Sequence, residues 1–167
     1  MKQLDHYSTS FTKQTFPITL VCENVTNAPN VGSLFRTADA FGVEKLILCG
    51  QLIPLGRKMT KTSRATEKSV DYKISEDILE EVNQLKTKGY QIIILEITDS
   101  SEAIHKYQFS TTQPIALIIG DENFGVSEAI LKLSDTVIHV EMYGQNSSMN
   151  VVQATSVALY EITKQFL

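Results

Sequence analysis

Three short segments rich in glycine, asparagine and acidic residues carry the side chains of this chain that are best suited to chemistry. They are residues 24–32, the run Gly120-Asp121-Glu122-Asn123-Phe124-Gly125 and residues 141–148. Carboxylates in these segments repel phosphate, so a ligand that contacts them is expected to be neutral or cationic at the point of contact. A sulfonium or an amino group meets that requirement better than a pyrophosphate does.

Two familiar phosphate-binding motifs are not satisfied. Gly120 and Gly125 have the glycine spacing of a P-loop, but Val126 stands where the phosphate-binding lysine is required. No Gly-x-Gly-x-x-Gly sequence opens a helix, which argues against a small-molecule enzyme that uses a dinucleotide. The histidines His6, His105 and His139 lack the spacing of zinc ligands, so we expect no metal.

The elements that must position these segments follow from the alternation of apolar runs with helical patterns. Strands are expected at 18–22, 45–49, 70–74, 90–97, 115–119 and 136–140, and helices at 31–41, 75–88, 127–133 and 148–166. Asn30 is expected to cap the first helix, Ser75 to begin the second, and the polar stretch 51–69 to be a loop. Apolar strands that alternate with helices predict an α/β fold with a mostly parallel sheet covered on both faces. Because ligands bind at the carboxyl ends of such strands, several polar segments are expected to meet at one edge.

Length and charge bound the organisation of the chain. Its 167 residues predict a single domain, 1–167, with no separate RNA-recognition domain. The net charge of −4 argues against a nucleic-acid partner only while its distribution is ignored. Residues 57–73 carry a local +4, and the remainder of the chain carries −8. This basic segment is either solvated surface or a site that neutralises phosphates.

Cysteine usage and hydropathy indicate the compartment. Cys22 and Cys49 lie in or beside apolar runs and are expected to be reduced core residues. No apolar run approaches the length of a membrane span, and the N-terminus lacks the apolar core of a signal peptide. We therefore expect a cytoplasmic protein.

Taken together, the three segments resemble motifs of the SpoU/TrmH family of RNA ribose 2'-O-methyltransferases, within the SPOUT superfamily. Residues 30–42 look like its first motif, Asn-x-Gly-x-x-x-Arg-x-Ala-x-x-x-Gly, and Ile119–Gly125 is similar to the second, Gly-x-Glu-x-x-Gly. Val140–Gly144 followed by Ser148–Val151 looks like the third. The third motif departs from the family's usual Ile-Pro-Met, because Glu141 replaces the proline.

The resemblance implies a SPOUT fold with a deep trefoil knot in its C-terminal part and an active site shared by two protomers of a homodimer. It implies methyl transfer from S-adenosylmethionine to a ribose 2'-hydroxyl of tRNA or rRNA. The implied cofactor-binding residues are Glu96, Ile97, Gly120, Val140, Met142, Ser148 and Met149, and the implied catalytic residues are Arg36, Asn30, Glu122, Ser148 and Asn150. Because a guanidinium is a poor base at neutral pH, we expect Arg36 to clamp phosphate and orient the hydroxyl, and its role as the general base stays open. The basic side chains expected to contact RNA are Arg57, Lys58, Lys61, Arg64 and Lys68.

Simpler interpretations remain open at this point. Ser148 and Asn150 can be a helix cap and first turn, and Arg36 a solvated side chain. Glu141 is compatible with a catalytically inactive RNA-binding module of the same fold. The small and β-branched residues between Val151 and Ala158 suit either a second protomer or the chain's own core.

Overall fold

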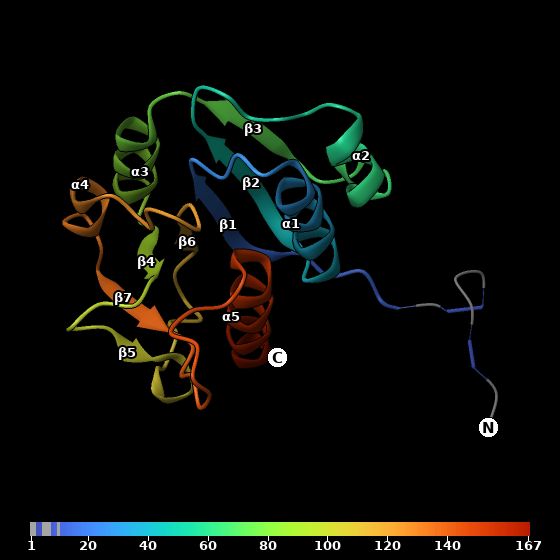
Figure 1. Ribbon diagram of the computed structural model, residues 1–167. Helices are drawn as coiled ribbons and strands as arrows, with labels where there is room; N and C mark the ends of the chain where they lie inside the picture. The colour runs from blue at the N-terminus through green and yellow to red at the C-terminus, as the bar shows by residue number, and fades with distance from the viewer. Residues whose placement is uncertain (1–2, 5–7, 10) are drawn as a thin grey trace.

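The computed structural model of the protein describes residues 3–4, 8–9 and 11–167. These residues form one seven-stranded sheet in the order β3-β2-β1-β6-β4-β7-β5, and all neighbouring strands are parallel (Figure 1). The strands are β1 (Phe16–Glu23), β2 (Val43–Cys49), β3 (Tyr72–Ser75), β4 (Gln91–Leu95), β5 (Glu102–Ala103), β6 (Ile115–Ile119) and β7 (Thr136–His139). The α-helices are α1 (Ala28–Ala40), α2 (Arg57–Ser63), α3 (Ile78–Thr87), α4 (Glu128–Leu131) and α5 (Val151–Phe166), and two 3₁₀ helices are η1 (Thr66–Lys68) and η2 (Ile104–Lys106).

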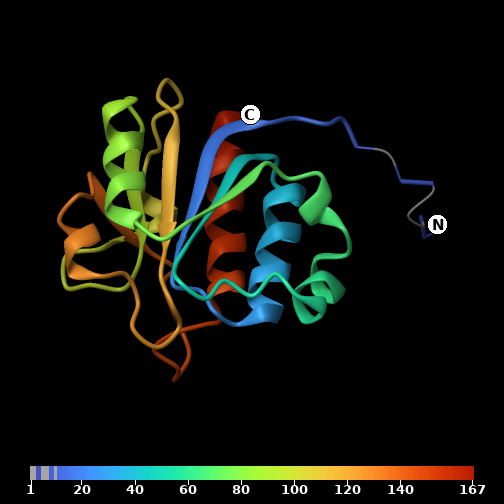
Figure 2. The ribbon, with the colours of Figure 1, turned by 90° about the horizontal axis from the view of Figure 1, so that it is seen from above.

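The sheet separates two layers of helices, with α3 and α4 on one face and α1 and α5 on the other (Figure 2). Successive strand residues point to opposite faces, so Leu20 and Cys22 belong to the α1–α5 core while Val21 belongs to the α3–α4 core. All five residues of β6 are buried, as a central parallel strand requires. The predicted α/β sheet covered on both faces is confirmed.

The first helix begins three residues earlier than expected. Asn27, not Asn30, is its N-cap: the Asn27 side chain accepts a hydrogen bond from the Asn30 N–H (3.1 Å), and Pro29 occupies the first turn, where its missing N–H costs little. The assignment of Asn30 as the cap was therefore wrong, and its side chain is available for another contact. Gly32 lies where α1 crosses α2, and a Cβ there would collide with the Met59 carbonyl.

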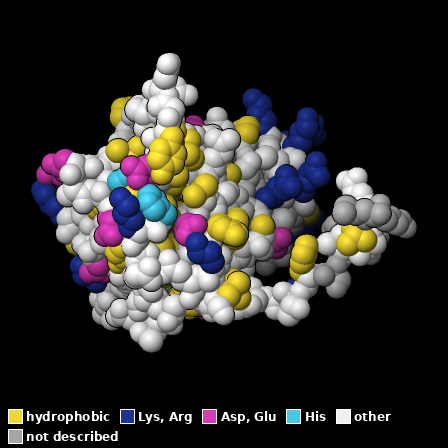
Figure 3. Space-filling model, turned by 90° about the horizontal axis from the view of Figure 1, so that it is seen from below, with side chains coloured by type: hydrophobic (Ala, Val, Ile, Leu, Met, Phe, Trp, Pro, Cys, Tyr) yellow, Lys and Arg dark blue, Asp and Glu magenta, His cyan; other side chains and the backbone are white. Residues whose placement is uncertain are grey.

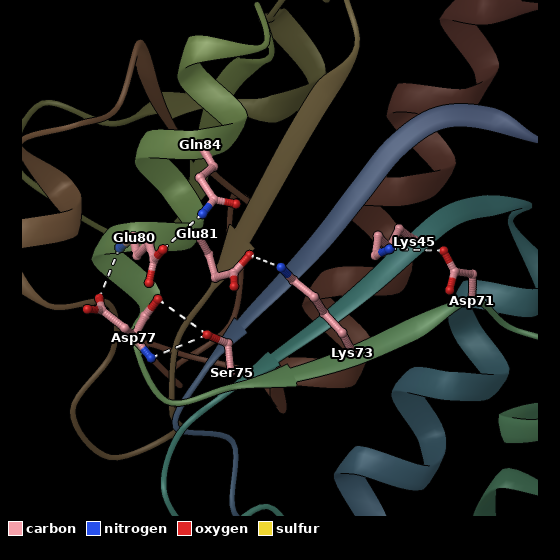
Figure 4. Close-up of polar contacts among 8 residues, drawn as sticks. All are labelled: Lys45, Asp71, Lys73, Ser75, Asp77, Glu80, Glu81 and Gln84. Atoms are coloured by element: carbon pink, nitrogen blue, oxygen red, sulfur yellow. Dashed lines mark hydrogen bonds and ion pairs between the residues drawn. The ribbon is translucent and has the colours of Figure 1, made fainter.

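The edge strand β3 is tied to its surroundings by charged and polar side chains (Figure 4). Lys73 forms an ion pair with Glu81 of α3, and Lys45 of β2 pairs with Asp71 (3.1 Å). Ser75 ends the strand and does not begin the next helix, because Asp77 caps α3 by accepting from the Glu80 N–H (2.9 Å).

Three further expectations need correction. The polar stretch 51–69 is not simply a loop, because it contains α2 and η1. The last helix begins at Val151 and not at Ser148, with Asn150 as its N-cap. The two-residue strand β5 was missed, since such a short element leaves no periodicity in the sequence.

Cys22 and Cys49 are free and buried, as expected. No helix among the described residues is long and apolar enough to cross a membrane.

Candidate active site

A cavity of about 470 Å³ opens at the carboxyl ends of β4, β6 and β7. Its walls come from the segments that follow these strands, and from the first turn of α5. All seven residues that the family resemblance implies for the cofactor line this cavity: Glu96, Ile97, Gly120, Val140, Met142, Ser148 and Met149. Residues up to 53 positions apart in the sequence thus meet at one edge of the sheet.

The polar lining of the cavity is acidic and neutral. Glu96, Asp121 and Glu122 contribute carboxylates, and no lysine or arginine is among the lining residues in the described part of the chain. The charge argument made from the sequence therefore holds in three dimensions: the cavity suits a cationic or neutral ligand better than a phosphate.

Two carboxylates fix the loop between β6 and α4 by accepting hydrogen bonds from its backbone. Glu23, at the end of β1 and only 5% exposed, accepts a hydrogen bond from the Ser127 N–H (2.9 Å). Glu96, just after β4, accepts from the Val126 N–H (3.1 Å) and the Ile97 N–H (2.8 Å). Sequence reasoning missed Glu23, although a carboxylate at the end of an otherwise apolar strand is a signal that could have found it.

Both glycines of this loop are required by close contacts. A Cβ on Gly120 would collide with the backbone of Gly125, and Gly125 itself has a φ of +66° with the Glu96 carboxylate against it. The two glycines, whose spacing resembles that of a P-loop, are therefore required for a tight turn that the Glu96 carboxylate contacts.

Asn150 joins the three motifs through one side-chain amide. Its Nδ2 donates to Glu122 Oε1 (2.6 Å) and to Asn30 Oδ1 (3.2 Å), while its Oδ1 accepts from the Val152 N–H (2.9 Å). The same asparagine therefore caps α5 and links Asn30 of the first motif to Glu122 of the second. The capping interpretation is therefore confirmed for Asn150, and its link between Asn30 and Glu122 is compatible with the predicted site.

Of the predicted catalytic residues, Glu122 and Ser148 line the cavity, and Asn30 and Asn150 join its wall through the hydrogen bonds to Glu122, whereas Arg36 does neither. It is exposed on α1, six residues after Asn30, and it is not among the described residues that line the cavity. Ser148, by contrast, lines the cavity wall.

Two residues that the sequence did not single out also line the cavity. Thr98 follows β4 and His139 ends the neighbouring strand β7, and the hydroxyl of Ser101 connects them: Ser101 Oγ lies 2.9 Å from His139 Nδ1 and accepts from the Thr98 N–H (3.0 Å). His139 was considered only as a metal ligand, and its dispersed position gave no other signal. Among the described residues no cluster of three His, Cys, Asp or Glu side chains is suited to a metal; His6 lies outside them.

Glu141, the departure in the third motif, points away from the cavity. Its neighbours Val140 and Met142 line the wall, whereas Glu141 is exposed with its carboxylate 4.0 Å from His105 Nε2. Glu141, the residue that is compatible with a catalytically inactive module, is therefore not part of the cavity lining.

The basic segment forms an exposed patch on one side of the molecule (Figure 3). The basic patch consists of Arg57, Lys58, Lys61, Arg64 and Lys68, all exposed, on α2, its C-cap and η1. A hydrogen bond from Ser63 holds the pKa of the Glu67 carboxyl below its usual value, so this acid remains ionised within the patch. The loops that line the cavity after β6 and β7 and the start of α2 lie toward the same edge of the sheet (Figure 2).

Comparison with known proteins is consistent with this geometry. Residues 17–160 match the model described as the SpoU rRNA Methylase family. The tRNA (guanosine(18)-2'-O)-methyltransferase of Thermus thermophilus is 31% identical over 152 residues, which cover 90% of this chain and 76% of that protein. The 23S rRNA (uridine(2479)-2'-O)-methyltransferase of Streptomyces viridochromogenes is 30% identical over 144 residues, 84% of this chain and 50% of that protein.

Solved structures are similar over the same range. The Aquifex aeolicus TrmH/SpoU tRNA modifying enzyme superposes with a TM-score of 0.82 at 28% identity, covering 92% of this chain and 77% of that one. The methyltransferase AviRb from Streptomyces viridochromogenes, in complex with the cofactor AdoMet, gives a TM-score of 0.78 at 27% identity, with 92% and 62% covered.

Proposed function

The chain belongs to the SpoU rRNA methylase family, and we propose that it transfers a methyl group from S-adenosylmethionine to a ribose 2'-hydroxyl of tRNA or rRNA. The observation that carries the proposal is the hydrogen-bonded group of Asn30, Glu122 and Asn150 beside the 470 Å³ cavity. Each member comes from a different motif, and their meeting is what a shared reaction centre requires.

The cavity fits the cofactor in shape and charge. Bound there, S-adenosylmethionine would supply an electrophilic methyl group on a positively charged sulfur. Glu122 and Asp121 favour that charge, and Val140, Met142 and Met149 provide apolar contact for the remainder of the molecule. AdoMet occupies the related structure of AviRb, which supports the same assignment.

The residues of this chain orient the attacking hydroxyl. Because Asn150 is fixed by three hydrogen bonds, its amide holds Glu122 and Asn30 in one arrangement without further ordering. Such preorganisation aligns the hydroxyl oxygen with the methyl carbon and limits the loss of entropy on reaction. Ser148, at the cavity wall, lies where it can hydrogen-bond either reactant.

Arg36 is assigned to a neighbouring protomer's site. Its absence from its own cavity and the exposure of Val157 and Tyr160 on α5 (39% and 58%) support a homodimer with composite active sites. The stripe on α5 is divided: Thr155 and Ala158 are buried in the chain's own core, while Val157 is exposed to a partner. Because a guanidinium is a strong hydrogen-bond donor and a poor base, we assign Arg36 to clamping a phosphate and orienting the hydroxyl.

The trefoil knot belongs to the same proposal. Its support is topological: β7 lies between β4 and β5, which residues 96–101 connect, and the chain passes from α4 on one face to α5 on the other. If the C-terminal segment is threaded, a chain pulled by its ends retains a shortened contour length after unfolding in a single-molecule experiment.

RNA recognition is assigned to the basic patch, since its five cations can neutralise phosphates along the substrate. We assign the enzyme to the cytoplasm, where reduced buried thiols such as Cys22 and Cys49 persist.

The function is tested by transfer of labelled methyl groups from S-adenosylmethionine to total RNA, with nuclease mapping of the ribose product. Arg36→Ala is expected to lower turnover by about a hundredfold or more while cofactor affinity, measured by calorimetry, is unchanged. Lys132→Ala, an exposed change on the α4 face, is the control. Wild-type turnover by Arg36→Ala removes Arg36 from the reaction, and failure of the unmodified protein to bind the cofactor favours the inactive module.

A further inference from the structure

A second cavity, of about 540 Å³, lies on the other side of the loop that follows β6. It is formed over the carboxyl ends of β1, β2 and β3, and it shares Asp121, Asn123 and Phe124 with the first cavity. The function described above uses only the first cavity. The second is therefore a separate recess that one loop divides from the proposed site of methyl transfer.

Backbone hydrogen bonds between neighbouring segments fix the floor of the second cavity. The Asn24 N–H donates to the Cys49 carbonyl (2.8 Å), and the Gly50 N–H donates to the Ser75 carbonyl (2.9 Å), which extends the sheet beyond its three strands. Asn24 adopts a left-handed conformation (φ +54°), uncommon for a residue with a side chain. Its amide oxygen lies against Gly50, where a Cβ would come within 2.9 Å.

The lining chemistry excludes a phosphate and suits a base. Among the described residues, no lysine or arginine lines this cavity, whereas Glu76 and Asp121 supply carboxylates that accept N–H donors. The amides of Asn24 and Gln51 supply donors and acceptors. Leu52 and Phe124, 81% and 91% exposed, offer apolar surface on which a planar ring can stack.

We propose that the second cavity receives a nucleobase of the RNA substrate, one that carries an exocyclic amino group. Guanine, adenine and cytosine present exocyclic amino N–H donors to a carboxylate, while uracil has no amino group and its single N3–H donor is flanked by two carbonyl oxygens that Glu76 and Asp121 repel. The base then lies in the second cavity and the cofactor in the first, on opposite sides of the Phe124 loop. The ribose of that nucleotide lies between the base and the cofactor. The inference rests on the proposed function, since it identifies which part of the RNA lies beside the methyl donor.

The direct test is a titration of the ¹⁵N-labelled protein with guanosine, adenosine, cytidine or uridine, followed through the side-chain amide resonances of Asn24 and Gln51. The amino-bearing nucleosides are expected to shift these resonances at concentrations where uridine does not. Glu76→Gln is expected to weaken that binding about tenfold, and Glu44→Gln, at the opposite end of β2, is expected to leave it unchanged. Asn24→Gly keeps the left-handed backbone and removes the amide, so it separates recognition from folding.

Resonances that move equally with uridine, or with none of the four nucleosides, would overturn the inference. So would Glu76→Gln binding that equals the unmodified protein. The nucleoside titration requires no methyl transfer, so a protein that binds amino-bearing nucleosides but methylates no RNA contradicts the proposed reaction and leaves the base cavity supported. Conversely, if the protein methylates RNA but the amide resonances of Asn24 and Gln51 do not shift with any nucleoside, the proposed reaction is supported and the proposed base cavity is wrong.

Discussion

Asn150 caps a helix and also belongs to the proposed reaction centre. Its carbonyl oxygen satisfies an N–H that the start of α5 leaves without a partner, and its amino group joins Glu122 and Asn30. A change at this position therefore affects the helix and the reaction centre, and the two effects need separate measurements.

We expect Asn150→Ala to lower the free energy of unfolding by about 1 kcal/mol through the lost cap. Turnover should fall by about a hundredfold, because Glu122 and Asn30 lose their common donor. Asp77→Ala removes the cap of α3 at a residue that does not line the first cavity, and it is the matched control for stability in chemical denaturation. Equal losses of turnover in the two variants would show that Asn150 acts through stability alone.

The buried thiols determine a different residue-scale property. Burial raises the pKa of Cys49 to about 12, with further contributions from Glu81 and Glu23, and burial raises the pKa of Cys22 as well. Because the folded-state values lie above the ordinary value of 9.0, the folded state favours the neutral thiols. Their contribution to stability is thus complete below about pH 9 and is lost as pH rises toward 12.

Both thiols are accordingly expected to resist an aromatic disulfide reagent at pH 8 and to react as soon as denaturant unfolds the chain. The free energy of unfolding should fall above pH 9, and less steeply in Cys49→Ala than in the unmodified protein. Rapid labelling of the folded protein would contradict the burial argument.

At the scale of elements, the loop between β6 and α4 and the helix α2 have different tasks. Hydrogen bonds to Glu23 and Glu96 fix the loop, so it forms a rigid wall of the cavity. Helix α2 instead packs on α1 through Gly32 and presents its cations outward. The first element positions reactants, and the second is suited to contact with a phosphate backbone.

Charge reversal separates the basic patch from ordinary solvated surface. Lys58→Glu with Lys68→Glu is expected to weaken RNA binding and to reduce the slope of log affinity against log salt by about one to two. Lys58 is chosen because an acid in the first turn of α2 suits the helix dipole and preserves folding. Lys106→Glu with Lys132→Glu, both outside the patch, has the same net charge, so an equal effect of the two pairs would assign the change to net charge.

For the whole molecule, the position of Arg36 has the largest consequence. The proposed composite active site takes Arg36 from one protomer and Asn150 from the other, so each variant lacks a different member of every site. In a heterodimer of Arg36→Ala and Asn150→Ala chains, one of the two sites is complete.

Mixing the two inactive variants in equal amounts, with unfolding and refolding together, is expected to restore on the order of a quarter of the unmodified activity by random assortment. Refolding each variant alone is the control. An inactive mixture that contains heterodimers would mean that Arg36 and Asn150 act in the same protomer's site.

The sequence by itself determined the α/β class, the positions of the main strands along the chain and the family. These follow from local information: apolar runs of strand length, helical periodicity and three motifs with fixed internal spacing. The seven residues that the family resemblance implies for the cofactor lie together around one cavity, because the carboxyl ends of parallel strands meet at one edge.

Only the tertiary structure decided contacts that depend on distant backbone. It assigned the cap of α1 to Asn27, turned Glu141 outward, and placed Glu23 beneath a loop more than 100 residues away. The sequence located the basic segment 57–73, but only the structure showed that part of it is a helix, α2, whose cations share an exposed surface. Hydrogen-bond geometry and the direction of a side chain are set by the packing of the whole chain, which no local pattern encodes.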